Sequence, residues 1–281
     1  MKFRTGIGRS WWVAGILAIA TIAFHRDLQD WFLYGRSSSL YAYTLMVPWI
    51  VFVMMMPSRR MGWFLVPAVL SMIALYYLGG NESAAMPPNR IRLFLFVLVV
   101  LSSLVILRGT VWAYQNIVPA ILLLAAIPLP AVAELALNDL LQVSSAIFSQ
   151  YAFQAAGIPV YREGLHLLLP GLTLHVDPSC SGIRSTLILF VAALVTGHVF
   201  LRRAGSRVAL VIAVVPLGIL RNALRIVTLG VLTLYVDPET IRGPLHLQGG
   251  PLFFAASLAL LLLLARWLVT LEKNNAHGGA S

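Results

Sequence analysis

The chain's only cysteine, Cys180, is the first residue that could do chemistry, because a thiolate is a strong nucleophile. It lies in the run Asp-Pro-Ser-Cys-Ser-Gly at 177–182, directly before an apolar stretch. Asp is favoured as a helix N-cap and Pro as the first helical residue, so the run predicts a helix that begins at Pro178. The helix dipole would then favour ionisation of the thiol. A buried structural cysteine is the alternative that position alone leaves open.

Two arginines, Arg221 and Arg225, interrupt a later apolar stretch, with Asn222 between them. An arginine near the centre of a bilayer costs roughly 2.5–3.5 kcal/mol on insertion scales, so it usually faces an interior cavity. The two arginines are four residues apart and share one helix face, which predicts an anionic partner or an aqueous cleft. A helix that starts at Arg207 rises about 27 Å by Arg225, to the level expected for Cys180. Snorkelling to the outer headgroups is the alternative.

A histidine, His246, precedes the last apolar stretch in a loop rich in glycine. His166 and His175, on a predicted hairpin, remain competitors for the same role, whereas His25 and His198 fall elsewhere in the predicted topology. Together a thiol, a guanidinium and an imidazole can carry out acyl transfer. The thiolate attacks a peptide carbonyl to form a thioester, the imidazole shuttles protons, and the arginine stabilises developing negative charge.

The elements that must position these residues are membrane-spanning helices. Of the 281 residues, 59% are hydrophobic and only 11% are charged, whereas soluble domains carry roughly 25% charged residues. The composition predicts an all-α integral membrane protein with a single polytopic domain over 1–281, and it excludes a soluble one. About eight apolar stretches are long enough to span a bilayer: 11–25, 40–57, 62–80, 91–107, 111–133, 182–201, 208–235 and 251–270.

The distribution of Lys and Arg over the short loops predicts the orientation. The densest arginine cluster, at 202–207, lies in the cytoplasm when both termini are cytoplasmic, and Cys180 then lies outside the plasma (inner) membrane. The net charge of +10 therefore reflects membrane topology, and no nucleic-acid partner is expected. Two further elements are predicted on the outer face. They are an interfacial amphipathic helix at 134–154 and a small hairpin around Pro170 and Gly171.

The pattern Cys-Ser-Gly-Ile-Arg-Ser at 180–185, Asn-Ala-Leu-Arg at 222–225 and a histidine before the last span resembles the exosortase/archaeosortase family. The motifs are concentrated in 177–250. The resemblance implies a membrane cysteine transpeptidase or peptidase in which Cys180 is the nucleophile, Arg225 the stabilising arginine and His246 the proton carrier. It also implies supporting or substrate-binding roles for a further set: Ser181, Gly182, Arg184, Arg221 and Asn222. Arg221 lies outside the Asn-x-x-Arg pattern, so no catalytic role is expected for it.

The resemblance further implies the partners. Family members are thought to act on secreted proteins with a C-terminal tail made of a short motif, such as Pro-Glu-Pro in the PEP-CTERM type, a hydrophobic helix and a basic end. The tail would pack against the spans in the lipid bilayer, and the thioester would pass to water, a lipid or a glycan. Arg184, Arg221 and Arg225 are candidates to hold an acidic residue of the motif. The sequence has no ligand cluster, phosphate loop or dinucleotide fingerprint, so no metal and no cofactor are expected.

Other functions remain open from the residues alone. In an anion or lipid transporter, or a lipid-binding membrane protein, Arg221 and Arg225 would line the site and Cys180 would be dispensable. In an intramembrane serine hydrolase, Ser179 or Ser181 would replace the thiol. In a structural scaffold, none of these residues would matter. Substitution of Cys180 and of Ser181 separates these possibilities.

Overall fold

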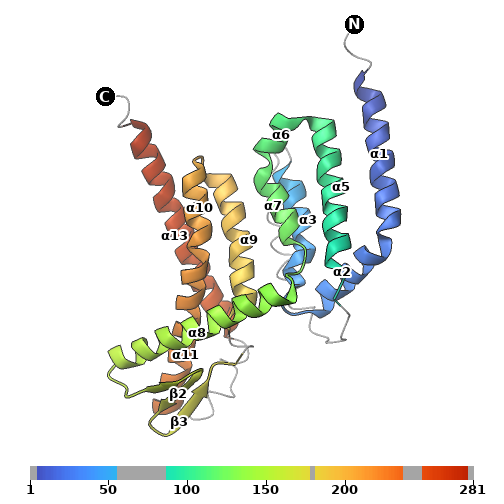
Figure 1. Cartoon of the computed structure of the whole chain (residues 1–281). Coiled ribbons are helices and arrows are strands. Elements are labelled where there is room, and N and C mark those ends of the chain that lie inside the picture. The colour runs from blue at the N-terminus through green and yellow to red at the C-terminus, as the bar shows by residue number, and fades with distance from the viewer. Residues whose placement is uncertain (1–4, 56–86, 178–180, 237–248, 278–281) are drawn as a thin grey trace. The chain divides into compact units, whose positions relative to one another are not determined.

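The computed structural model describes residues 5–55, 87–177, 181–236 and 249–277 (Figure 1). The chain divides into two compact units, Met1–Pro130 and Ala131–Ser281. Five of the described helical segments are long and apolar enough to cross a membrane: Arg90–Arg108, Ala131–Ala155, Ile183–Phe200, Ala204–Tyr235 and Gly250–Asn275. The prediction of an all-α membrane protein is confirmed.

The first unit is helical throughout its described part. Its elements are α1 (Thr5–Ala23), α2 (His25–Ser37), the 3-10 helix η1 (Ala42–Met46), α3 (Val47–Met54), α5 (Arg90–Arg108), α6 (Thr110–Gln115) and α7 (Ile117–Ala125). Helix α1 packs against α5, and α3 packs against α7. The buried carboxylate of Asp27 on α2 lies 3.1 Å from the Arg92 Nε on α5. The indole of Trp31 donates a hydrogen bond to the Ala126 carbonyl at the end of α7, over 2.9 Å.

The second unit contains every described candidate for chemistry. It begins with α8 (Ala131–Ala155) and continues with the strands β1 (Tyr161–Glu163), β2 (His166–Leu169) and β3 (Leu172–His175). The helices α9 (Ile183–Phe200), α10 (Ala204–Ile212), α11 (Val214–Tyr235) and α13 (Gly250–His277) follow. Helices α9, α10 and α13 pack side by side, and α8 runs across their direction (Figure 1).

Two apolar clusters hold this second unit together. In one, residues of α9, α10, α11 and α13 pack around the fully buried Leu189, Leu210 and Leu261. In the other, the inner face of the sheet packs on α8 and α11 around the buried Phe153 and Leu167. Helix α11 belongs to both clusters and therefore connects the helical bundle to the sheet and α8.

The predicted hairpin is confirmed, and a third strand precedes it. Strands β2 and β3 are antiparallel, and Leu169 pairs with Leu172 across the Pro-Gly turn. Gly171 has φ +77°, a left-handed conformation that glycine adopts without strain. Strand β1 adds to the other edge of β2 through a turn at Gly164. Its three residues are too few to show an alternating pattern in the sequence.

Proline interrupts the helix in two of the predicted spans, although the second still lies within one candidate span, Ala204–Tyr235. The stretch 111–133 is not one helix: α6 ends at Gln115, and α7 begins at Ile117 and ends at Ala125. Pro119 has no N–H for the carbonyl four residues earlier, and Pro128 and Pro130 follow the end of α7. The stretch 208–235 divides in the same way at Ala213, three residues before Pro216. The predicted span 62–80 lies outside the described residues.

Helix α8 confirms the predicted helix at 134–154, but its polar side chains are buried against the protein instead of facing water. The polar Gln142, Ser145 and Ser149 are buried against the protein, at 3%, 0% and 0% exposure. The large side chains of Leu140 and Phe148 are about half exposed. The helix therefore buries three polar side chains against the protein, beside Leu141 and Phe153, and exposes large apolar side chains on its outer side.

Candidate active site

The structure describes six of the eight predicted site residues: Ser181, Gly182, Arg184, Arg221, Asn222 and Arg225. Cys180 and His246 lie outside the described residues. The six come from two places, the start of α9 and the middle of α11. These two helices pack against each other. The described part of the cysteine motif, 181–185, therefore meets the arginine motif, 221–225, in space.

Helix α9 begins at Ile183, which corrects the prediction that it starts at Pro178. Gly182 precedes the helix and has φ +75°, a left-handed conformation that a right-handed helix cannot contain. Cys180 therefore precedes α9 in the chain and is not the third residue of that helix. The sequence carries both signals: the Asp-Pro pair favours an early helix start, and the glycine favours a later one.

The Gly182 carbonyl oxygen is the point at which the two motifs join. It accepts a hydrogen bond from Arg221 Nη2 over 2.9 Å, and another from Thr186 Oγ1 over 3.0 Å. It also accepts the backbone N–H of Thr186, at 3.0 Å, which is the first helical bond of α9. Three donors on one carbonyl fix the position of this peptide group relative to α11.

A small residue on α11 allows this close approach. Gly218 lies beside Thr186, and a Cβ there would be 2.6 Å from the Thr186 hydroxyl oxygen. A Cβ on Gly182 would overlap Arg221 Nη2 and lie 3.4 Å from Asn222 Oδ1. Gly218 therefore lets Thr186 approach α11 closely, and Gly182 suits both its left-handed backbone conformation and its contact with Arg221.

Two neighbouring polar residues of α11, Arg221 and Asn222, are deeply buried. Arg221 is 7% exposed and Asn222 is 1% exposed. Arg221 Nη1 and Asn222 Nδ2 are enclosed without a hydrogen-bond acceptor among the described residues. Arg225 and Arg184 are partly buried, and each interacts with another part of the protein. The contact between Arg221 and Gly182 brings the middle of α11 to the start of α9, and the predicted common membrane level of Arg225 and Cys180 stays a prediction.

A residue that the sequence reasoning missed, Gln142, reaches the same region from α8. Its Nε2 donates to the Val176 carbonyl over 3.0 Å, and its Oε1 accepts from Asn138 Nδ2 over 3.2 Å. Two turns further along α8, the Ser149 hydroxyl lies 3.5 Å from the Ala223 carbonyl on α11. The spacing of three to four residues between Asn138, Gln142, Ser145 and Ser149 was the available signal, because it predicts a single polar face.

The competing histidines form a pair on the sheet. His166 and His175 are directly opposite each other on β2 and β3, and their ring centroids are 4.4 Å apart. Both are exposed, on the face of the sheet opposite to its packed leucines. His198 is in the last turn of α9, at the opposite end of that helix from Gly182.

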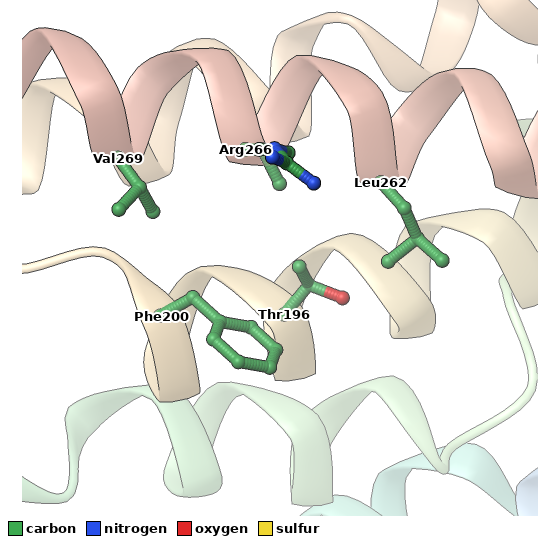
Figure 2. A pocket seen from close by; sticks show the side chains of 6 residues that line it. Thr196, Phe200, Leu262, Arg266 and Val269 are labelled. Atoms are coloured by element: carbon green, nitrogen blue, oxygen red, sulfur yellow. The ribbon is translucent and has the colours of Figure 1, made fainter.

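A separate cavity of about 300 Å³ lies between α9 and α13 (Figure 2). Figure 2 shows Thr196 and Phe200 facing Leu262, Arg266 and Val269 across it. Thr196 is near the C-terminal end of α9, roughly 20 Å along the helix from Ile183 at 1.5 Å per residue. The cavity therefore does not belong to the candidate site. Among the residues that the structure describes, no group of three His, Cys, Asp or Glu side chains could hold a metal ion.

Comparison with known proteins gives one match. A family model described as transmembrane exosortase (Exosortase_EpsH) matches residues 31–263, which is most of the chain. That range includes Cys180, Arg225 and His246. No curated protein and no solved structure matches.

Proposed function

The chain belongs to the transmembrane exosortase family, and on that basis we propose that it is a membrane cysteine transpeptidase that removes C-terminal sorting tails from secreted proteins. The Cys180 thiolate attacks the scissile carbonyl and forms a thioester, with release of the tail. The thioester then passes to an acceptor nucleophile, which is water or an amine of a lipid or glycan.

We assign the other roles by residue. Arg225 stabilises the oxyanion that develops on the attacked carbonyl, and His246 takes the thiol proton and returns it to the leaving amine. Arg184, in the first turn of α9, binds an acidic residue of the sorting motif. Ser181, Gly182 and Asn222 support the geometry of the site.

The single observation that carries this proposal is the hydrogen bond between Arg221 and Gly182. It joins the arginine motif to the cysteine motif, although the two are 39 residues apart in the sequence. Arg225 follows Arg221 by one helical turn, on the same face of α11. The bond holds Arg221 at Gly182, two residues after the chain's only cysteine in the sequence, which supports the proposal that a guanidinium acts beside the thiol.

The proposed topology places this chemistry at the outer face of the plasma membrane, with both termini in the cytoplasm. Arg202 and Arg203 follow the opposite end of α9, which agrees with the preference of basic residues for the cytoplasmic side. The hydrophobic part of a sorting tail would lie among the spans, and its cleavage motif would emerge beside the start of α9.

The experiment compares Cys180→Ala, Ser181→Ala and wild type in the native host, each checked for abundance in the membrane. Mass spectrometry of membrane proteins would detect retained hydrophobic C-terminal tails. We expect a set of secreted proteins to keep their tails in the Cys180→Ala strain and to lose them in the other two. Complete processing in the Cys180→Ala strain would disprove the thiol mechanism, and loss of processing only in Ser181→Ala would indicate a serine hydrolase.

A further inference from the structure

We propose that the cavity between α9 and α13 binds a phospholipid with an anionic headgroup. Part of one acyl chain lies in the cavity, and the headgroup contacts Arg266 and the arginines at the end of α9. The site takes no part in the proposed acyl transfer and therefore goes beyond the proposed function. Three features of the second unit support it: the position of the cavity, the unpaired guanidinium in its wall, and the positive charge at this end of the helices.

The cavity lies on the outer side of the seam between the two helices. Three of its lining residues on α13 each directly follow a buried residue of the helical bundle: Leu262 follows Leu261, Arg266 follows Ala265, and Val269 follows Leu268. A helix turns by about 100° per residue, so the three lie beside the packed face of α13 and not on it. Both helices are candidate membrane spans, so an outer cavity between them faces lipid.

The wall of the cavity is mostly apolar. Phe200, Leu262 and Val269 border it, and the smaller Thr196 and Ala265 leave the space between the helices open (Figure 2). An empty gap forfeits van der Waals contacts, and a flexible apolar chain restores them. The volume of about 300 Å³ is at the lower end of the range for ligand sites, which suits part of an acyl chain rather than a whole lipid.

Arg266 gives this apolar wall a positive charge. Its side chain lines the cavity, and its guanidinium has no hydrogen-bond or ion-pair partner among the residues that the structure describes. An unpaired cation at the edge of the hydrocarbon is costly, so an anion at this position would stabilise it. The phosphate of a lipid supplies that anion from the same molecule that supplies the acyl chain.

Further arginines lie at the same end of the cavity. Phe200 is the last residue of α9, and the exposed Arg202 and Arg203 follow one residue later. Glu272 of α13 accepts the backbone N–H groups of these two arginines, at 2.9 and 3.0 Å, which fixes their turn beside α13. Arg266 precedes Glu272 by six residues, about 9 Å of helix rise. Three guanidinium groups therefore share one end of the cavity with a single carboxylate.

The level of Arg266 along α13 suits a lipid headgroup. The neighbouring Trp267 is 57% exposed, and tryptophan is enriched where a membrane meets water. Basic pockets between spanning helices are known sites for the headgroups of anionic lipids. The same positive charge disfavours other occupants, because a second copy of the chain would bring its own arginines, and a helix with a basic end would be repelled.

The test measures lipid binding to the full-length protein by native mass spectrometry from detergent. Three probes are titrated: phosphatidylglycerol, which is anionic; phosphatidylcholine, which has the same acyl chains and no net charge; and glycerol phosphate, which has the charge and no acyl chain. The variants are Arg266→Gln, Arg266→Lys and Thr196→Leu. Arg108→Gln is the matched control, because it removes the same charge from another exposed arginine at a helix end, beside Trp112.

We expect the wild type to bind phosphatidylglycerol at least about fivefold more tightly than phosphatidylcholine, because each basic residue beside an anionic headgroup contributes about fivefold. Arg266→Gln should lose about that factor for phosphatidylglycerol and leave phosphatidylcholine unchanged. Arg266→Lys keeps the charge and should keep most of the preference. Thr196→Leu fills part of the cavity and should weaken binding of both phospholipids. Arg108→Gln should bind all three probes as the wild type does.

Equal affinity of the wild type for the two phospholipids would overturn the proposal. An equal loss in Arg266→Gln and Arg108→Gln would also overturn it, because general attraction between charges would then explain the binding. Glycerol phosphate bound as tightly as phosphatidylglycerol would show that the cavity holds no acyl chain. A protein dimer that Arg266→Gln or Thr196→Leu disrupts, without a lipid preference, would assign the cavity to a second copy. If Arg266→Gln does not accumulate, the two phospholipids compared on the wild type and on Thr196→Leu decide the question.

Discussion

Replacement of Gly182 by alanine tests the junction between the two motifs most directly. The change introduces two costs. An alanine in the left-handed conformation, at φ +75°, costs about 1–2 kcal/mol relative to glycine. The new Cβ also overlaps Arg221 Nη2. That atom is the end of a flexible side chain and can move away, so the second cost is the lost hydrogen bond rather than steric overlap.

A hydrogen bond from a charged donor contributes about 1.5–3 kcal/mol. The two costs together predict that Gly182→Ala lowers the free energy of unfolding by about 2.5–5 kcal/mol. Gly157→Ala is the matched control, because Gly157 has nearly the same φ, +74°, and no atom within 4 Å of a Cβ. It should lose only the conformational cost of about 1–2 kcal/mol.

The assay is equilibrium unfolding in mixed micelles, followed by the fluorescence of the chain's 7 tryptophans. The double variant Gly182→Ala, Arg221→Ala completes a thermodynamic cycle, and we expect the two changes to be less than additive, because each removes the same hydrogen bond. If Gly182→Ala is no more destabilising than Gly157→Ala, or if the cycle is additive, then Arg221 does not hold the Gly182 carbonyl, and the reasoning that joins the two motifs is refuted.

Three further substitutions test contacts that support the two units, each measured as a change in unfolding free energy in the same assay. Gly230→Ala places a Cβ 2.6 Å from the buried Phe153 ring. The overpacking cost of about 1–3 kcal/mol should exceed the gain of about 1 kcal/mol in helix propensity, so the protein should be less stable. An unchanged free energy of unfolding would mean that α8 moves aside. Glu272→Gln removes a carboxylate that accepts two backbone N–H groups of the α9–α10 turn, at 2.9 and 3.0 Å, and should cost about 1 kcal/mol. Asp27→Asn should cost about 1 kcal/mol or less, because Arg92 is half exposed; a larger loss would show a stronger ion pair than the geometry supports.

The sequence was informative wherever one local rule governed an element. The hairpin followed from alternation around Pro170 and Gly171, and α5 and α9 followed from uninterrupted apolar stretches. Where two local rules competed, the prediction was wrong. Asp177 and Pro178 favoured a helix start, Gly182 opposed one, and only the packing against α11 decides in favour of the glycine.

Spans broken by proline show a second limit. Hydropathy averages over a window, so it is blind to one missing N–H at Pro119 or Pro216. The total apolar length of 208–235 remains long enough to cross a bilayer, and α10 and α11 together still form a candidate span. The interruption at Ala213 separates α10 from α11, and Arg221 and Arg225 lie on α11.

Helix α8 illustrates why the site itself could not be completed from the sequence. Its polar residues were interpreted as facing water, since that is the rule for an amphipathic helix at a membrane surface. In a membrane protein the same stripe can face the protein interior, because lipid is the less polar of the two surroundings. Only the fold distinguishes the two cases, and here it places Gln142 on the Val176 carbonyl. A buried polar side chain needs a hydrogen-bond partner. For Gln142 that partner is the Val176 carbonyl, four residues before the only cysteine in the sequence.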